Sequence, residues 1–176
     1  MISSIIRFFK KNPIMTYSLI CFTIIISSYI LTPSLEIKDS QIRVLTLKDA
    51  LFVFVFNTAI FLVLISLSFT GLPLLLLISF LIKVGATGKH SFASFWVYYG
   101  SSFIHLALEL FVYYIVTLIT IRNLAKVLLY FANNDINLKL EFPRLKAEIF
   151  TVIVVLFFAA LVEVFVSNRL FLLLSS

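Results

Sequence analysis

The apolar stretch SFIHLALELFVYYIVTLITI, residues 102–121, carries a histidine and a glutamate four residues apart, His105 and Glu109. A membrane-spanning helix needs about 20 predominantly apolar residues, and this stretch has that length. A helix turns about 100° per residue, so the two side chains lie on the same face. Because ionisable groups are costly in hydrocarbon, the stretch predicts a span whose polar face is turned toward protein or a water-filled cavity.

The composition of the whole chain also indicates a membrane protein. Of its 176 residues, 62% are hydrophobic and 12% are charged, whereas a soluble domain is roughly half apolar and about a quarter charged. The formal net charge is +6, but the basic residues are scattered at the ends of apolar runs, which argues against nucleic-acid binding. The abundance of Phe, Ile, Lys and Asn suggests an AT-rich bacterial genome. We therefore predict an all-α, polytopic helical bundle, embedded as a multi-pass protein in the lipid bilayer of a bacterial cell membrane.

Five apolar runs are expected to cross the membrane as helices. Pro33 ends the first run, and Gly71 and Pro73 divide a run from Ala50 to Gly88 that is too long for one helix. Gly suits the end of one helix and Pro the first turn of the next, so a tight hairpin is expected there. The spans are expected at residues 14–32, 50–70, 72–87, 102–121 and 147–167, within a single transmembrane domain that covers residues 1–176.

Two segments beside the fourth span are expected to lie at the membrane surface. Residues 92–99 contain five aromatic residues of the kind that form interfacial belts, and Gly100-Ser101-Ser102 separates them from the span. A single long, tilted helix through both segments is the alternative. Residues 122–133 place apolar side chains at i, i+3, i+4 and i+7, which predicts an amphipathic helix for the inner membrane surface or for a partner protein.

The basic residues predict the orientation of the chain in the membrane. Cytoplasmic segments carry an excess of Lys and Arg, so the N-terminus is expected in the cytoplasm and the C-terminus outside. The cytoplasmic side then holds Arg7, Lys10, Lys11, Arg122, Lys126, Lys139, Arg144 and Lys146, the outer side holds Lys38, Arg43, Lys48, Lys89 and Arg169, and Lys83 lies in the membrane.

A third acidic residue, Glu163, lies in the last apolar run. On the expected topology His105, Glu109 and Glu163 lie at a similar depth, so we predict that they line one polar intramembrane site for proton handling or acyl chemistry, with metal binding the least favoured role. A helix-packing role for the pair His105 and Glu109 is equally compatible with the sequence. For Glu163, the alternative to a place in the site is that its side chain reaches the lipid headgroups. No metal or cofactor is expected, because His-x3-Glu offers only two ligands and HExxH is absent. Asn57, in the second span, is expected to form an interhelical hydrogen bond.

Several of these residues resemble the motifs of the stage II sporulation protein M family. Its members carry an Asn early in the second span, glycines around the second and third spans, a Pro-His-Gly-x-x-Glu element and, in the last span, an Ala-x-x-Glu element. The corresponding residues here are Asn57 and Gly71, then Ile104-His105-Leu106-Ala107-Leu108-Glu109, which lacks the Pro and Gly, and Ala160-Leu161-Val162-Glu163. The Asn-Gly that is usual in the third span is replaced around Ser79-Phe80. The resemblance covers most of the chain through short motifs.

The resemblance implies two kinds of function. The sporulation members look like membrane scaffolds for a cell-wall-remodelling complex, whereas short members of similar size accompany circular bacteriocins and a small ABC-type ATPase. The short chain is more similar to the second group, which implies a role in export, maturation or immunity of a membrane-active, hydrophobic peptide. The ATPase is expected to dock on Arg122, Lys126, Arg144 and Lys146, because the chain has no nucleotide-binding motif. An intramembrane peptide-processing enzyme is the second alternative, and the sequence leaves open whether the chain forms a homo-oligomer.

Overall fold

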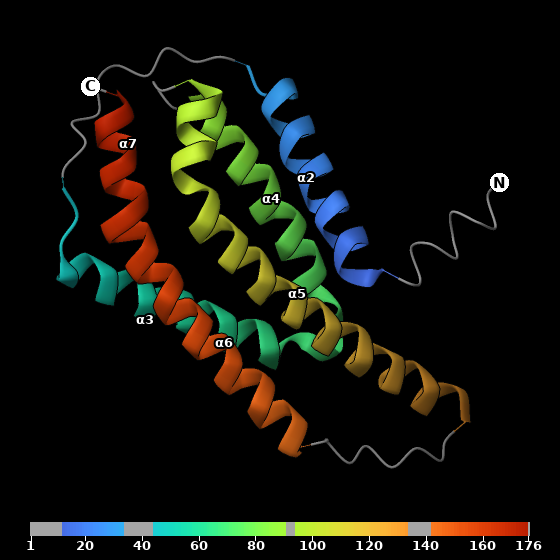
Figure 1. Ribbon diagram of the computed structural model, residues 1–176. Coiled ribbons are helices and arrows are strands. Elements are labelled where there is room, and N and C mark those ends of the chain that lie inside the picture. Colours follow the sequence, from blue (N-terminus) through green and yellow to red (C-terminus); the bar gives the residue numbers. More distant parts are fainter. Residues whose placement is uncertain (1–11, 34–43, 91–93, 134–141, 176) are drawn as a thin grey trace.

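The computed structural model describes residues 12–33, 44–90, 94–133 and 142–175, and in these residues it contains helices and no strand (Figure 1). Five helical segments are long and apolar enough to cross a membrane. The expected all-α, polytopic fold is therefore confirmed. The helical elements are α2 (Pro13–Leu31), α3 (Leu47–Ser66), a 3-10 turn η1 (Ser68–Thr70), α4 (Leu72–His90), α5 (Phe95–Asn133), α6 (Phe142–Val162), a π-helical turn η2 (Glu163–Ser167) and α7 (Asn168–Ser175).

Successive helical segments run in alternating directions, as spans joined by connections on alternate sides of a membrane must. Late residues of α2 meet late residues of α4, as in the hydrogen bond from Ser28 to the Ile82 carbonyl, so these two helices are parallel. Early residues of α5 meet late residues of the last segment, and later ones meet the start of α6, so these segments are antiparallel. The helices therefore pack as a five-span bundle.

The turn between α3 and α4 has the residues that its geometry requires. Gly71 adopts a left-handed conformation with φ 74°, which a side chain would disfavour. Leu72 then begins α4, and Pro73 occupies the first turn, where its missing N–H costs nothing. The hairpin expected from Gly71 and Pro73 is therefore confirmed.

Helix α5 does not break at Gly100-Ser101-Ser102. It is one helix of 39 residues, so the break expected between residues 92–99 and the fourth span is absent, and the single long helix is correct. A lone Gly costs only about 1 kcal/mol in a helix, and the Ser101 hydroxyl donates to the Tyr98 carbonyl within the helix. Residues 122–133 continue the same helix, while residues 92 and 93 lie outside the described part of the chain.

The helix α5 occupies the centre of the bundle and divides its core into two clusters. One cluster joins α5 to α2 and α4 through residues such as Cys21, Leu81 and Leu106. The other joins α5 to α3 and α6 through residues such as Val116 and Val152. Because α3 and α4 contact α5 on its two sides and hardly contact each other, a space remains between them.

The pair α2 and α4 is held together by close backbone approach. A Cβ atom added at Gly85 would lie 2.4 Å from the Ile25 carbonyl oxygen, so only glycine permits this contact. Gly88 leaves similar room for the Tyr99 ring, whose hydroxyl donates to the Val84 carbonyl at 3.2 Å. Elsewhere the helices expose large apolar side chains over most of their length, which places them in contact with lipid.

Candidate functional site

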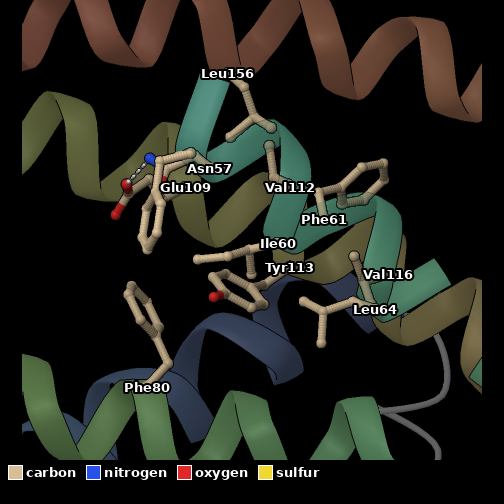
Figure 2. A pocket seen from close by; sticks show the side chains of 11 residues that line it. Asn57, Ile60, Phe61, Leu64, Phe80, Glu109, Val112, Tyr113, Val116 and Leu156 are labelled. Carbon is tan, nitrogen blue, oxygen red and sulfur yellow. Dashed lines mark hydrogen bonds between the residues drawn. The ribbon is translucent and has the colours of Figure 1, made fainter. Parts of the chain in front are cut away.

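Asn57 and Glu109 meet near the middle of the bundle, between α3 and α5. The Asn57 amide donates a hydrogen bond to one Glu109 carboxylate oxygen at 3.3 Å, and Figure 2 shows the second oxygen pointing away from that amide. Asn57 lies near the midpoint of α3, and both side chains are only partly buried. The interhelical hydrogen bond expected for Asn57 is therefore present, and its acceptor is one of the predicted site residues.

His105 does not pair with Glu109, although the two lie one helical turn apart. Its Nδ1 atom lies 3.1 Å from the hydroxyl oxygen of Ser167, in the π-helical turn η2. In this turn the Asn168 backbone N–H bonds to the Glu163 carbonyl five residues earlier. Single π-helical turns inside α-helices occur frequently at functional sites. The histidine is therefore fixed by an irregular segment of the last span, and neighbouring helices supply the partners of both His105 and Glu109.

Glu163 begins this π-helical turn and lies close enough to Glu109 for the two carboxylates to interact electrostatically. Tyr98, two turns before His105 on α5, interacts with both acids in the same way. The structure thus brings Glu163 into the electrostatic neighbourhood of Glu109. We call Asn57, Tyr98, Glu109 and Glu163 the mid-bundle cluster, and His105 instead forms a separate contact with Ser167.

A crevice of about 240 Å³ reaches the Asn57–Glu109 pair from the space between α3 and α4 (Figure 2). Its walls are aliphatic and aromatic, with Phe80 of α4 stacked on Tyr113 of α5 at a ring-centroid distance of 4.7 Å. The lining residue Phe56 is 56% exposed, so the crevice opens on the surface of α3. An apolar slot with one carboxylate at its end can bind an apolar group that carries a polar tip.

Within residues 12–33, 44–90, 94–133 and 142–175, no three His, Cys, Asp or Glu side chains are placed so that they could hold a metal ion. The residues that sequence reasoning missed are Ser167 and Tyr98. Neither has a local sequence signal, because the contact of Ser167 depends on the π-helical turn and that of Tyr98 on the unbroken start of α5.

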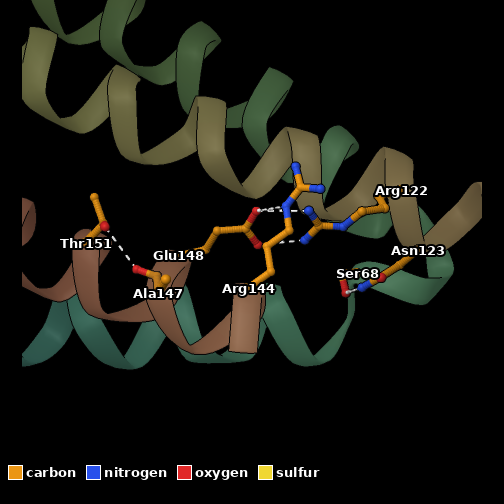
Figure 3. Close-up of polar contacts among 7 residues, drawn as sticks. All are labelled: Ser68, Arg122, Asn123, Arg144, Ala147, Glu148 and Thr151. Carbon is orange, nitrogen blue, oxygen red and sulfur yellow. Dashed lines mark hydrogen bonds and ion pairs between the residues drawn. The ribbon is translucent and has the colours of Figure 1, made fainter. Parts of the chain in front are cut away.

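A second polar cluster lies toward the other end of α5 (Figure 3). Arg122 donates two hydrogen bonds to Glu148 on α6, at 2.9 and 2.6 Å, and Arg144 donates one to the same carboxylate at 3.2 Å. Beside them the buried Asn123 amide donates to the Ser68 hydroxyl at 2.7 Å. We call these five residues the α5–α6 clamp.

Of the four residues expected to bind a partner, Arg122 and Arg144 thus have a partner inside the chain. Lys126 is half-buried on α5 and Lys146 is exposed on α6. Leu124 of α5 lies against the turn at Gly71. Figure 1 shows the last turns of α5 projecting past that turn. The remaining basic residues of this side, Arg7, Lys10, Lys11 and Lys139, lie outside the described residues, as do Lys38 and Arg43 of the other side.

Comparison with protein-family models, curated proteins and solved structures yields no match for this chain. The resemblance to the stage II sporulation protein M family therefore rests on its short motifs. In the structure, three of the motif residues from separate segments, Asn57, Glu109 and Glu163, lie in the mid-bundle cluster.

Proposed function

We propose that this chain takes part in the export, maturation or immunity of a membrane-active, hydrophobic peptide in a bacterial cell membrane, and that it acts together with an ABC-type ATPase. The observation that carries the proposal is the crevice between α3 and α4. It opens on an apolar surface and is lined by the carboxylate of Glu109 on α5. That carboxylate is held by Asn57, which lies near the middle of α3. A peptide in the bilayer can enter such a crevice sideways, without passing through water.

The projecting end of α5 supports the second part of the proposal. Leu128, Leu129 and Phe131 are 61%, 50% and 76% exposed there, and Lys126 lies one turn earlier. An apolar helix surface with a neighbouring cation suits either the membrane surface or a groove on a partner protein. We place the proposed ATPase at this projecting end and not on Arg122 or Arg144, because those two side chains already form ion pairs with Glu148.

The proposal can be tested in a bacterium that carries this chain at its native locus, where we expect genes for a hydrophobic peptide and an ABC-type ATPase beside it. Glu109→Gln keeps an acceptor for the Asn57 amide but removes the charge at the end of the crevice. We expect at least a tenfold fall in released peptide at an unchanged amount of membrane-bound chain. Thr23→Val, on an exposed face of α2, is the matched control and should leave release unchanged. Normal release by Glu109→Gln, or neighbouring genes that encode wall hydrolases instead, would overturn the proposal in favour of a scaffold.

One specific contact favours an intramembrane processing enzyme as the second candidate. A hydroxyl beside an imidazole can act in acyl transfer, with the imidazole accepting the hydroxyl proton as the oxygen attacks a carbonyl carbon. Ser167 and His105 have that contact, but Ser167 is 5% exposed and does not line the crevice. If Ser167→Ala leaves the precursor unprocessed while the chain stays in the membrane, the enzyme is favoured. Complete processing by this variant excludes this role for Ser167.

A further inference from the structure

The size of the crevice decides what part of a peptide it can hold. A cavity of about 150 Å³ accommodates one benzene molecule, and the crevice between α3 and α4 measures about 240 Å³. It therefore takes one long side chain with part of a neighbouring one, and an entire helix is far too large for it. The rest of a bound helix must lie outside, against the exposed faces of α3 and α4.

Those faces suit an apolar helix. On α3, Phe52 and Phe56 are 70% and 56% exposed, and on α4 Leu76, one turn before the crevice residue Phe80, is 42% exposed. Between them lies the crevice, which Ile60 borders from α3 and Phe80 borders from α4. A helix lying along these faces can pack in the manner of membrane helices and direct one side chain inward.

The carboxylate of Glu109 determines which chemical group the end of that side chain should carry. Among the described residues Glu109 accepts one hydrogen bond, from the neutral amide of Asn57, and the charged group that acts on it electrostatically is a second acid, Glu163. In the described part of the chain, neither acid forms a hydrogen bond or ion pair with Lys or Arg. His105, the nearest basic residue on the same helix, contacts Ser167 instead. A cationic partner stabilises the ionised form of a carboxylate in a membrane, and a bound ligand can supply that partner.

We infer that the crevice binds a lysine side chain that projects from an apolar peptide helix, with the methylene stem between α3 and α4 and the ammonium group on Glu109. This inference rests on the proposed function and names its substrate class. The four methylenes of lysine match the apolar walls, and its ammonium group donates up to three hydrogen bonds, of which the second Glu109 oxygen accepts one.

The test uses the full chain in lipid nanodiscs and three synthetic peptides. Each is a 20-residue Leu/Ala helix with a photo-crosslinking residue one turn from its centre, and the central position is Lys, Gln or Leu. We expect the Lys peptide to crosslink to α3 and α4 at least tenfold more than the other two. Glu109→Gln should reduce the Lys peptide to their level, and the control Thr23→Val should change nothing. Ile60→Trp, which narrows the crevice and keeps the carboxylate, should also reduce crosslinking.

Two results would overturn the inference. One is equal crosslinking of the Lys, Gln and Leu peptides, and the other is a Lys peptide that is unaffected by both Glu109→Gln and Ile60→Trp. The outcomes also separate the inference from the proposed function. If release in cells depends on Glu109 but the three peptides crosslink equally, the lysine site is wrong and the proposed function stands. If only the Lys peptide crosslinks but release does not depend on Glu109, the site stands and the proposed function is wrong.

Discussion

Glu148, in the α5–α6 clamp, receives hydrogen bonds from two arginines, whereas Glu109, in the mid-bundle cluster, receives one from a neutral amide among the described residues. Glu109 lies on α5 and Glu148 contacts it from α6, and both acids are partly buried. The first arrangement balances charge within the chain, so it is suited to holding α5 against α6. The second leaves a carboxylate facing a crevice, which favours a role in binding. The difference separates polar residues that stabilise the bundle from those that serve a site.

Glu148→Ala should have the largest effect on stability. Breaking a fully buried ion pair costs about 3–5 kcal/mol, but the Arg122 and Glu148 side chains are each 19% exposed. Screening by solvent should reduce the loss in unfolding free energy to about 2 kcal/mol. Titration of the chain in mild detergent with sodium dodecyl sulfate measures this loss.

The control for this variant is the double replacement Arg122→Met with Glu148→Leu, which removes both charges and keeps apolar bulk. It should recover most of the lost stability, because no unpaired charge remains. A double variant as unstable as Glu148→Ala would show that the clamp contributes packing and not charge balance.

Ser68→Ala should have an intermediate effect. It removes the acceptor of the buried Asn123 amide, which is 6% exposed, and leaves that donor without its partner. We expect a loss of about 1 kcal/mol in the same titration, with export of peptide unchanged. Ser66→Ala, on an exposed position of α3, is the matched control and should be neutral. If Ser68→Ala abolished export at normal stability, the clamp would belong to the functional site.

Asn57→Leu should have the smallest effect on stability and a large effect on binding. Interhelical hydrogen bonds in a membrane contribute about 0.6 kcal/mol on average, and this bond is long at 3.3 Å. Without the amide, Glu109 is free to change rotamer at the end of the crevice, so crosslinking of the Lys peptide should fall several-fold. A loss of stability above that of Glu148→Ala would reverse the comparison and make Asn57 a structural residue.

The sequence predicted the fold well because length and apolar composition decide which segments can cross a bilayer. The first and third spans were expected at residues 14–32 and 72–87, and the helices there are Pro13–Leu31 and Leu72–His90. The continuity of α5 was missed because Gly and Ser interrupt an apolar pattern without breaking a helix. Local composition cannot show whether the backbone hydrogen bonds continue through such an interruption.

The site was predicted in part. Residues Glu109 and Glu163 were expected near each other from their depth alone, and they interact electrostatically. The partner of His105 was not predicted, since only the π-helical turn brings Ser167 to it. Glu148 had a local signal that was overlooked, because it lies four residues after Arg144 and such pairs face each other on a helix.

The unbroken length of α5 has a mechanical consequence. Its 39 residues extend about 58 Å, nearly twice the thickness of the hydrocarbon core. A single helix therefore carries Glu109, contributes Arg122 to the α5–α6 clamp and ends beyond the turn at Gly71. Because the helix is continuous between Glu109 and Arg122, a change in the tilt of the projecting end would move both positions together.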